Sequence, residues 1–153
     1  MKVTKILEWD MGHRIPNHTS KCKNPHGHRY KIEVTLEGDL ITTKGDSSQG
    51  MVIDFSDIKK ILMQEIDAVC DHSFMYYKND IVMHDFFKKN SELAHIAVPF
   101  IPTAENIAAW LFKKLHFQFK NTFKQKVQLV AVKLWETPTS ASIVKKEDIE
   151  NIE

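Results

Sequence analysis

The chain has 153 residues, and its 21 Lys and Arg against 20 Asp and Glu leave a net charge of +1. This is the size and charge balance of a single domain spanning residues 1–153. The charges are interspersed and form neither a basic stripe nor a polybasic tail, so we expect no nucleic-acid partner and no membrane partner. Two cysteines and the lack of a secretory leader pattern favour a cytoplasmic protein with free thiols.

The first half of the chain predicts two strands and a helix. Residues 3–11 are rich in β-branched and bulky side chains, which indicates a strand. From His28 onward apolar and polar residues alternate with a period of two, as in a half-buried strand. A polar connection over 38–50 follows. Ser56 is then expected to cap a helix whose apolar residues repeat at three- and four-residue spacing until it ends near Cys70, a buried packing residue.

The second half begins with a segment that has no regular pattern. Residues 73–101 predict one or two helical turns around 85–90 and otherwise irregular backbone, because the nearby prolines favour extended conformations. Thr103 is expected to cap a second helix with one apolar stripe.

Two final strands, at 127–136 and 140–145, complete the expected elements. The element order ββααββ predicts an α+β fold with a four-stranded antiparallel sheet and both helices on one of its faces. The acidic tail, residues 147–153, is expected to fray.

Three of the eight histidines lie close together in the pattern. His13 ends the first predicted strand, and His26 and His28 lead into the second. Residues two apart on a strand point to the same side about 6.6 Å apart, so a hairpin would bring all three imidazoles to one face. Three neutral nitrogen ligands and no carboxylate would leave Zn²⁺ one open position, as in a catalytic site. A single histidine at a strand end is more often a satisfied polar residue.

Cys22 offers a competing interpretation of the same cluster. It lies four residues before His26 and could complete a closed Cys/His₃ structural zinc site. Against this, a chain of 153 residues buries enough surface to fold without a structural metal. A loop cysteine beside Lys21, Lys23 and a divalent cation would instead be usable as a base or nucleophile.

Four further residues are candidates, three of them acidic and one a histidine beside an aspartate. Asp71 and His72 are adjacent, and a carboxylate beside an imidazole can orient it, although neighbours in sequence seldom face each other. Glu136 shares strand parity with apolar residues, where a carboxylate needs a cationic or hydrogen-bonding partner such as a guanidinium-like ligand group. Glu105 opens the second helix, where a negative charge also favours the helix dipole.

Together these residues form motifs that resemble the 6-pyruvoyltetrahydropterin synthase family, in particular its bacterial 6-carboxytetrahydropterin synthase branch. The resemblance extends over residues 4–145. The motifs are His13-Arg14, Lys21-Cys22 with three residues before His26-Gly27-His28, Asp71-His72, Pro102-Thr103-Ala104-Glu105-Asn106 and Trp135-Glu136-Thr137-Pro138-Thr139-Ser140.

The resemblance implies a T-fold that assembles into trimers stacked as hexamers, with active sites at subunit interfaces. It implies zinc bound by His13, His26 and His28, with Cys22 as proton acceptor. It further implies His72, supported by Asp71, as the partner of the cysteine. Glu136 would anchor the pterin and count among the catalytic groups, with Thr103 and Glu105 as further substrate contacts.

The reaction that the resemblance implies starts from 7,8-dihydroneopterin triphosphate. The product is 6-carboxy-5,6,7,8-tetrahydropterin, with loss of acetaldehyde and triphosphate, as a step in queuosine biosynthesis. The three-residue gap between Cys22 and His26 suits this branch, since the animal 6-pyruvoyl enzymes have a longer gap. Met11-Gly12 replaces a small pair that often precedes the first histidine, and Ser73-Phe74 begins an unusual, longer connection to the second helix.

Three functions therefore remain open from the sequence. The first is the zinc-dependent pterin lyase. The second is the same scaffold acting as a 6-pyruvoyltetrahydropterin synthase or a related dihydroneopterin-type lyase. The third is a non-enzymatic zinc-binding module with Cys22 as fourth ligand.

Overall fold

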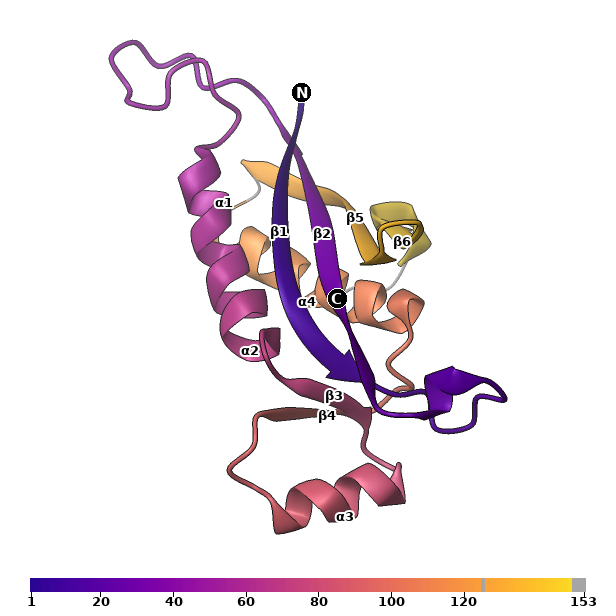
Figure 1. The fold of residues 1–153 in the computed structure, drawn as a ribbon. Coiled ribbons are helices and arrows are strands. Elements are labelled where there is room, and N and C mark those ends of the chain that lie inside the picture. The colour runs from indigo at the N-terminus through magenta and orange to yellow at the C-terminus, as the bar shows by residue number, and fades with distance from the viewer. Residues whose placement is uncertain (125, 150–153) are drawn as a thin grey trace.

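The computed structural model of the chain describes residues 1–124 and 126–149. Six strands form one mixed sheet in the order β4-β3-β1-β2-β5-β6 (Figure 1). The strands are β1 (Lys2–His13), β2 (His26–Gly38), β3 (Phe74–Tyr77), β4 (His95–Val98), β5 (Val127–Thr137) and β6 (Ser140–Lys145). The helices are α1 (Phe55–Leu62), which continues through a π-helical turn (Met63–Asp67) into α2 (Ala68–Cys70), then α3 (Ile81–Lys89) and α4 (Ala104–Phe123).

The centre of the sheet is the long antiparallel hairpin of β1 and β2. The register runs from Lys2 opposite Glu37 to His13 opposite His26. β5 pairs antiparallel with the other edge of β2. Alternate residues of β2 are buried, as the period of two predicts, because one face of the strand packs on the core and the other faces solvent.

The helices α1 and α4 cover the apolar face of this sheet (Figure 1). Trp9 stacks on Tyr30 with ring centroids 5.6 Å apart, and both are buried beneath the apolar stripe of α4. Burying a large apolar side chain contributes roughly 1.5–3 kcal/mol to folding, so this layer holds the hairpin in place without a metal.

The helix termini agree only in part with the sequence. Thr103 caps α4 as predicted, since its hydroxyl accepts a hydrogen bond from the Asn106 N–H. The predicted Ser56 cap of α1 is wrong: the Asp54 carboxylate accepts from the Ser56 N–H and holds that position. An aspartate is as good an N-cap as a serine, and Asp54 has the extended backbone that a cap requires. The helix ends at Cys70 as expected, and burial raises the pKa of that thiol to about 12.

The four-stranded antiparallel sheet is the expectation that needs correction. Residues 73–101 contain β3, α3 and β4, and both extra strands run parallel to their neighbours, so the sheet is mixed. Each extra strand is only four residues long, too short for an alternation pattern to identify. They form because β3 pairs with the end of β1 and β4 then pairs with β3.

The C-terminal end was expected to fray from residue 147. Residues 146–148 form a short 3₁₀ turn instead, and 150–153 lie outside the described residues. Within the described ranges, no helix has the length and apolar character to cross a membrane.

Candidate metal centre and adjoining cleft

Three imidazoles meet where the central hairpin ends. His13 stands opposite His26 in the register, and His28 follows two residues along β2. The ring centroids lie 4.6 Å apart for His13 and His26, 5.2 Å for His13 and His28, and 5.0 Å for His26 and His28. One ring nitrogen of each lies within 4.8 Å of the others. The predicted convergence is therefore confirmed, and the group could hold a metal ion.

Backbone carbonyls fix two of the three rings. The His13 Nδ1–H donates to the Pro102 carbonyl at 2.7 Å, and the His26 Nδ1–H donates to the Asn24 carbonyl at 2.7 Å. A carbonyl can only accept, so both Nε2 atoms carry no proton and present a lone pair. Within residues 1–124 and 126–149, the buried His13 Nε2 has no hydrogen-bond partner. An orphaned acceptor of this kind fits a bound cation.

The electrostatics of the cluster also favour a cation. Burial lowers the pKa of His13 to about 4 and lowers the pKa of His28 as well. Both rings are therefore neutral at pH 7, which is the form that binds metals.

The same burial predicts that the metal-free protein loses stability in acid. Protonation of His13 favours the unfolded chain, where the pKa of the imidazole is about 6.5. Above that pH His13 is neutral in both states, so it does not lower the free energy of unfolding. The free energy of unfolding should then fall by roughly 3 kcal/mol as the pH drops from 6.5 towards 4. Urea titrations of the metal-free protein across this range measure the slope.

A His13→Asn variant is the matched control for this prediction, because its amide can still donate to the Pro102 carbonyl but does not titrate. It should lose less stability over the same range, although His28 and His116, whose pKa values burial also lowers, still contribute to the slope. Parallel slopes for parent and variant would contradict the assignment to His13.

Glu136 lies beside the cluster, at the end of β5. Its Oε1 is 3.6 Å from His13 Nε2 and 4.0 Å from His28 Nε2. Pairing between β2 and β5 stops at Lys31 and Trp135, so the strand ends separate beyond that point. A cleft of about 540 Å³ opens there, lined by both His28 and Glu136. The carboxylate therefore faces an opening next to the candidate metal centre.

Cys22 lies in the loop that joins His13 to His26, within a 3₁₀ turn (Lys21–Lys23). It is half-buried and unbonded to another cysteine. In the described part of the chain, the group that could hold a metal ion consists of the three histidines and does not include Cys22. This geometry favours an open three-histidine centre over the closed Cys/His₃ site.

Asp71 and His72 contact each other although they are adjacent in sequence. The His72 Nδ1–H donates to the Asp71 carboxylate at 2.8 Å, because His72 takes a left-handed backbone with φ of 58°. The backbone N–H of Asp10 holds the other Asp71 oxygen. The hydrogen bond to Asp71 raises the pKa of His72. A left-handed residue after a helix is usually Gly or Asn, so a histidine there points to a use for its side chain.

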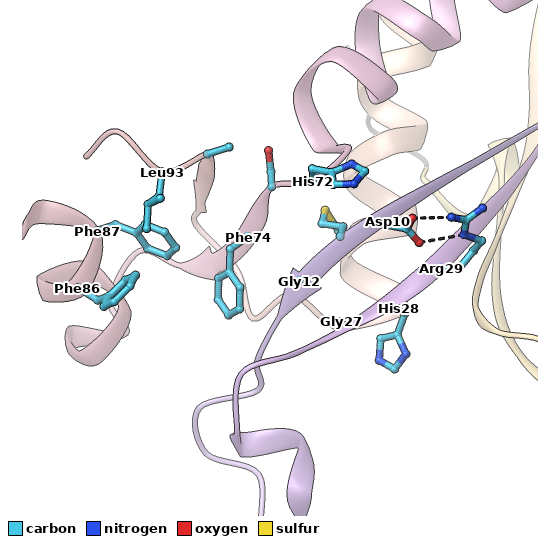
Figure 2. A pocket seen from close by; sticks show the side chains of 13 residues that line it. Asp10, Gly12, Gly27, His28, Arg29, His72, Phe74, Phe86, Phe87 and Leu93 are labelled. Atoms are coloured by element: carbon cyan, nitrogen blue, oxygen red, sulfur yellow. Dashed lines mark hydrogen bonds and ion pairs between the residues drawn. The ribbon is translucent and has the colours of Figure 1, made fainter. Parts of the chain in front are cut away.

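The pair lies on the other face of the hairpin from the metal centre. His72 stands next to Asp10 and Arg29, whose side chains alternate with those of the buried face. Figure 2 shows the His28 ring directed away from His72. Within the described residues, no hydrogen bond joins the Cys22 thiol to His72.

Thr103 is the N-cap of α4 and Glu105 lies in its first turn, directly after the Pro102 carbonyl that orients His13. The Thr103 hydroxyl serves as the cap, and Glu105 is exposed in the first turn. The roles of the Asn24 and Pro102 carbonyls could not be predicted from the sequence, because any residue supplies a carbonyl. The one available signal was that Pro102 directly precedes the predicted helix cap.

The fold and the site together define an α+β protein with an open three-histidine centre, the kind of centre that holds a catalytic metal. The chain belongs to the 6-pyruvoyl tetrahydropterin synthase family, whose sequence model matches residues 2–147.

Similar proteins of known name agree with this membership. A 6-carboxy-5,6,7,8-tetrahydropterin synthase of Haemophilus influenzae is 35% identical over 148 residues, covering 91% of this chain and 94% of the relative. One of Rickettsia conorii is 37% identical over 142 residues, covering 90% and 95%. The solved 6-pyruvoyl tetrahydropterin synthase of Caenorhabditis elegans superposes with a TM-score of 0.66 at 25% identity, covering 95% of this chain and 94% of that one.

Proposed function

We propose that the protein is a zinc-dependent 6-carboxytetrahydropterin synthase. It would convert 7,8-dihydroneopterin triphosphate to 6-carboxy-5,6,7,8-tetrahydropterin and release acetaldehyde and triphosphate. The proposal rests mainly on the three-histidine centre. Backbone carbonyls orient the rings of His13 and His26 so that their Nε2 lone pairs are available. The centre adjoins the cleft lined by His28 and Glu136. The relatives at about 35% identity, which bear this enzyme name, support the choice of reaction.

His13, His26 and His28 would hold the zinc. When bound, Zn²⁺ supplies a Lewis acid that stabilises negative charge developing on the hydroxyls of the substrate side chain. Three neutral ligands leave its full charge available for this task. Because two of the rings are oriented by carbonyls, the centre is formed before the metal arrives.

Cys22 and His72 would move the protons. We assign Cys22 as the proton acceptor, since its loop joins the two strand ends that carry His13 and His26. Asp71 raises the pKa of His72, so the imidazolium persists to higher pH and can return a proton to the substrate. The Asp10 N–H and His72 keep the pKa of Asp71 low, so the carboxylate stays ionised and continues to orient the ring.

The placement of His72 requires a second subunit in this proposal. A side chain on the opposite face of the hairpin cannot easily reach substrate bound at its own Glu136 cleft. In a homo-oligomer, a trimer or a hexamer, His72 of one subunit would serve the centre of its neighbour. Cys22 and His72 at one active site would then come from different chains.

Glu136 would recognise the pterin. The pterin presents a 2-amino group and a ring N–H on one edge, and a carboxylate accepts two such hydrogen bonds side by side. Its distance of 3.6 Å from His13 Nε2 supports a substrate held next to the metal. Thr103 and Glu105, on the segment that also orients His13, would complete the substrate contacts.

The test of this proposal is the Glu136→Gln variant, because it separates a pterin site from any other zinc site. Losing one partner of a desolvated, charge-assisted pair costs about 2 to 5 kcal/mol, which is roughly 30-fold to several thousand-fold in affinity. Glu136→Gln should therefore weaken pterin binding while zinc content stays at the parent level. Calorimetric titration with a non-reactive pterin measures the affinity.

Glu37→Gln is the matched control, since Glu37 is an exposed glutamate at the far end of β2. It should bind the pterin like the parent. If Glu136→Gln and Glu136→Ala both bind and turn over the substrate like the parent, Glu136 is only a strand-end residue and the assigned pterin position is wrong.

A 6-pyruvoyltetrahydropterin synthase activity is the second candidate. The superposition with the Caenorhabditis elegans enzyme supports it, because the scaffold is shared. The three-residue spacing between Cys22 and His26 favours the carboxy reaction.

A further inference from the structure

An outer unit, residues 74–98, extends beyond the end of the central hairpin (Figure 1). It consists of β3, α3 and β4. Its interior is a small apolar cluster of Tyr76, Met83 and Phe87 with Phe74 packed against it, separate from the main core. The unit also buries Met75 of β3 and Val98 of β4 in the main core, so both apolar packing and specific backbone and polar contacts position it.

The backbone and polar contacts that join this part of the chain to the end of β1 converge on His13 and its two neighbours. Where the unit begins, β3 pairs with β1 at Gly12 opposite Phe74 and at His13 opposite Met75. After the unit ends, the Pro102 carbonyl accepts the hydrogen bond from His13 Nδ1. The segment that enters the outer unit therefore pairs with the backbone of His13, and the segment that follows the unit holds the His13 ring.

Gly12 allows the close approach that this arrangement needs. A Cβ atom at Gly12 would lie 2.6 Å from Cδ2 of Phe74, nearer than real side-chain contacts come. Figure 2 shows the Phe74 ring beside Gly12 at the end of the hairpin. The two departures from the family pattern, Met11-Gly12 and Ser73-Phe74, therefore fit each other.

An ion pair adds a third connection on the other side of His13. Arg14 Nε donates to Asp80 Oδ2 at 2.6 Å, and Arg14 Nη2 donates to Asp80 Oδ1 at 3.1 Å. Asp80 is 5% exposed and is also the N-cap of α3. Arg14 directly follows His13 and begins the loop that carries Cys22.

This pair differs from an ordinary surface ion pair. Exposed pairs contribute little, whereas a buried two-pronged pair leaves an uncompensated charge when one partner is removed. The described chain contains another two-pronged pair, Arg29 with Asp10, but its side chains are largely exposed. Arg14 and Asp80 therefore fix one geometry between the outer unit and the residue that follows His13.

We propose that Arg14 and Asp80 are positioning residues for the metal centre. By holding the outer unit against the end of β1, they fix the orientation of His13 relative to His26 and His28. The metal affinity would then depend on two residues that do not themselves bind the metal. This inference rests on the proposed function, in which the three histidines bind zinc.

The test compares zinc affinity with fold stability. Asp80→Asn keeps the size and the capping ability of the side chain but removes its charge. The metal-stripped variant should bind zinc about tenfold more weakly than the parent, the lower end of the range for residues that orient ligands. Competition against a zinc chelator gives the affinity, and thermal unfolding of the metal-free proteins gives the stability.

Glu65→Gln is the matched control. Glu65 forms a half-buried ion pair with Lys114 at 3.2 Å, between the π-helical turn and α4. Glu65→Gln should lower the melting temperature and leave zinc affinity unchanged. If Asp80→Asn behaves in the same way, the pair is merely structural and the inference is overturned.

A second variant keeps the test decisive if Asp80→Asn fails to fold. Replacing both partners, as Arg14→Leu with Asp80→Asn, leaves no buried unpaired charge and keeps a side chain that can cap α3. This double variant should fold and still bind zinc about tenfold more weakly. Parent-like affinity would overturn the inference. A parent protein that binds no zinc would instead overturn the proposed function, and this inference with it.

Discussion

Replacing His26 or His28 with alanine should abolish zinc binding and turnover together. Residues that only orient a ligand typically change metal affinity by about 10- to 100-fold, and the loss of one of three ligands should exceed that range. The fold should survive, because the main core of sheet and helices packs without the metal. Metal analysis after dialysis, with circular dichroism of the same samples, measures both properties.

His84→Ala provides the control for this result. His84 is an exposed histidine on α3, outside the three-histidine group. It should retain one zinc per chain and parent activity. Unchanged zinc stoichiometry in both His26→Ala and His28→Ala would refute the assigned centre.

Cys22→Ala should separate metal binding from catalysis. The thiol is assigned to proton transfer, which typically contributes 10²- to 10⁴-fold to a rate, so turnover should fall by about that factor. Zinc content should stay at one per chain, because the metal-binding group does not include Cys22. Loss of zinc together with activity would favour the structural Cys/His₃ site instead.

The same variant tests whether active sites are shared between subunits. Cys22→Ala and His72→Ala chains should each be nearly inactive alone. If Cys22 and His72 at one site come from different chains, mixed oligomers reassembled from the two variants regain some complete sites and measurable turnover. If mixed oligomers form without any recovery of activity, His72 does not serve the centre of its neighbour.

Much of the fold follows from local patterns in the sequence. The alternation from His28 onward identifies β2, and the Thr103 cap with its following apolar stripe identifies α4. The outer unit was not predictable in this way. β3 and β4 are four residues long and gain their stability from pairing with β1 and with each other, which is a long-range effect.

The candidate site, like the fold, could be predicted from the sequence only in part. The spacing of His13, His26 and His28 predicts their convergence, because strand geometry fixes which side chains share a face. The contact between Asp71 and His72 depends on a left-handed backbone at His72, which no local pattern indicated. The Arg14–Asp80 pair joins residues 66 positions apart, so only the folded structure reveals it.

Identification of the small fragment that the zinc-loaded protein releases from 7,8-dihydroneopterin triphosphate would establish which reaction it catalyses. We expect acetaldehyde in equal amount to the pterin consumed, with a 6-carboxy product. Complete consumption without acetaldehyde, with the three-carbon side chain retained on the pterin, would contradict it and identify a 6-pyruvoyltetrahydropterin synthase. No consumption by the zinc-loaded protein would contradict the assignment of this substrate altogether.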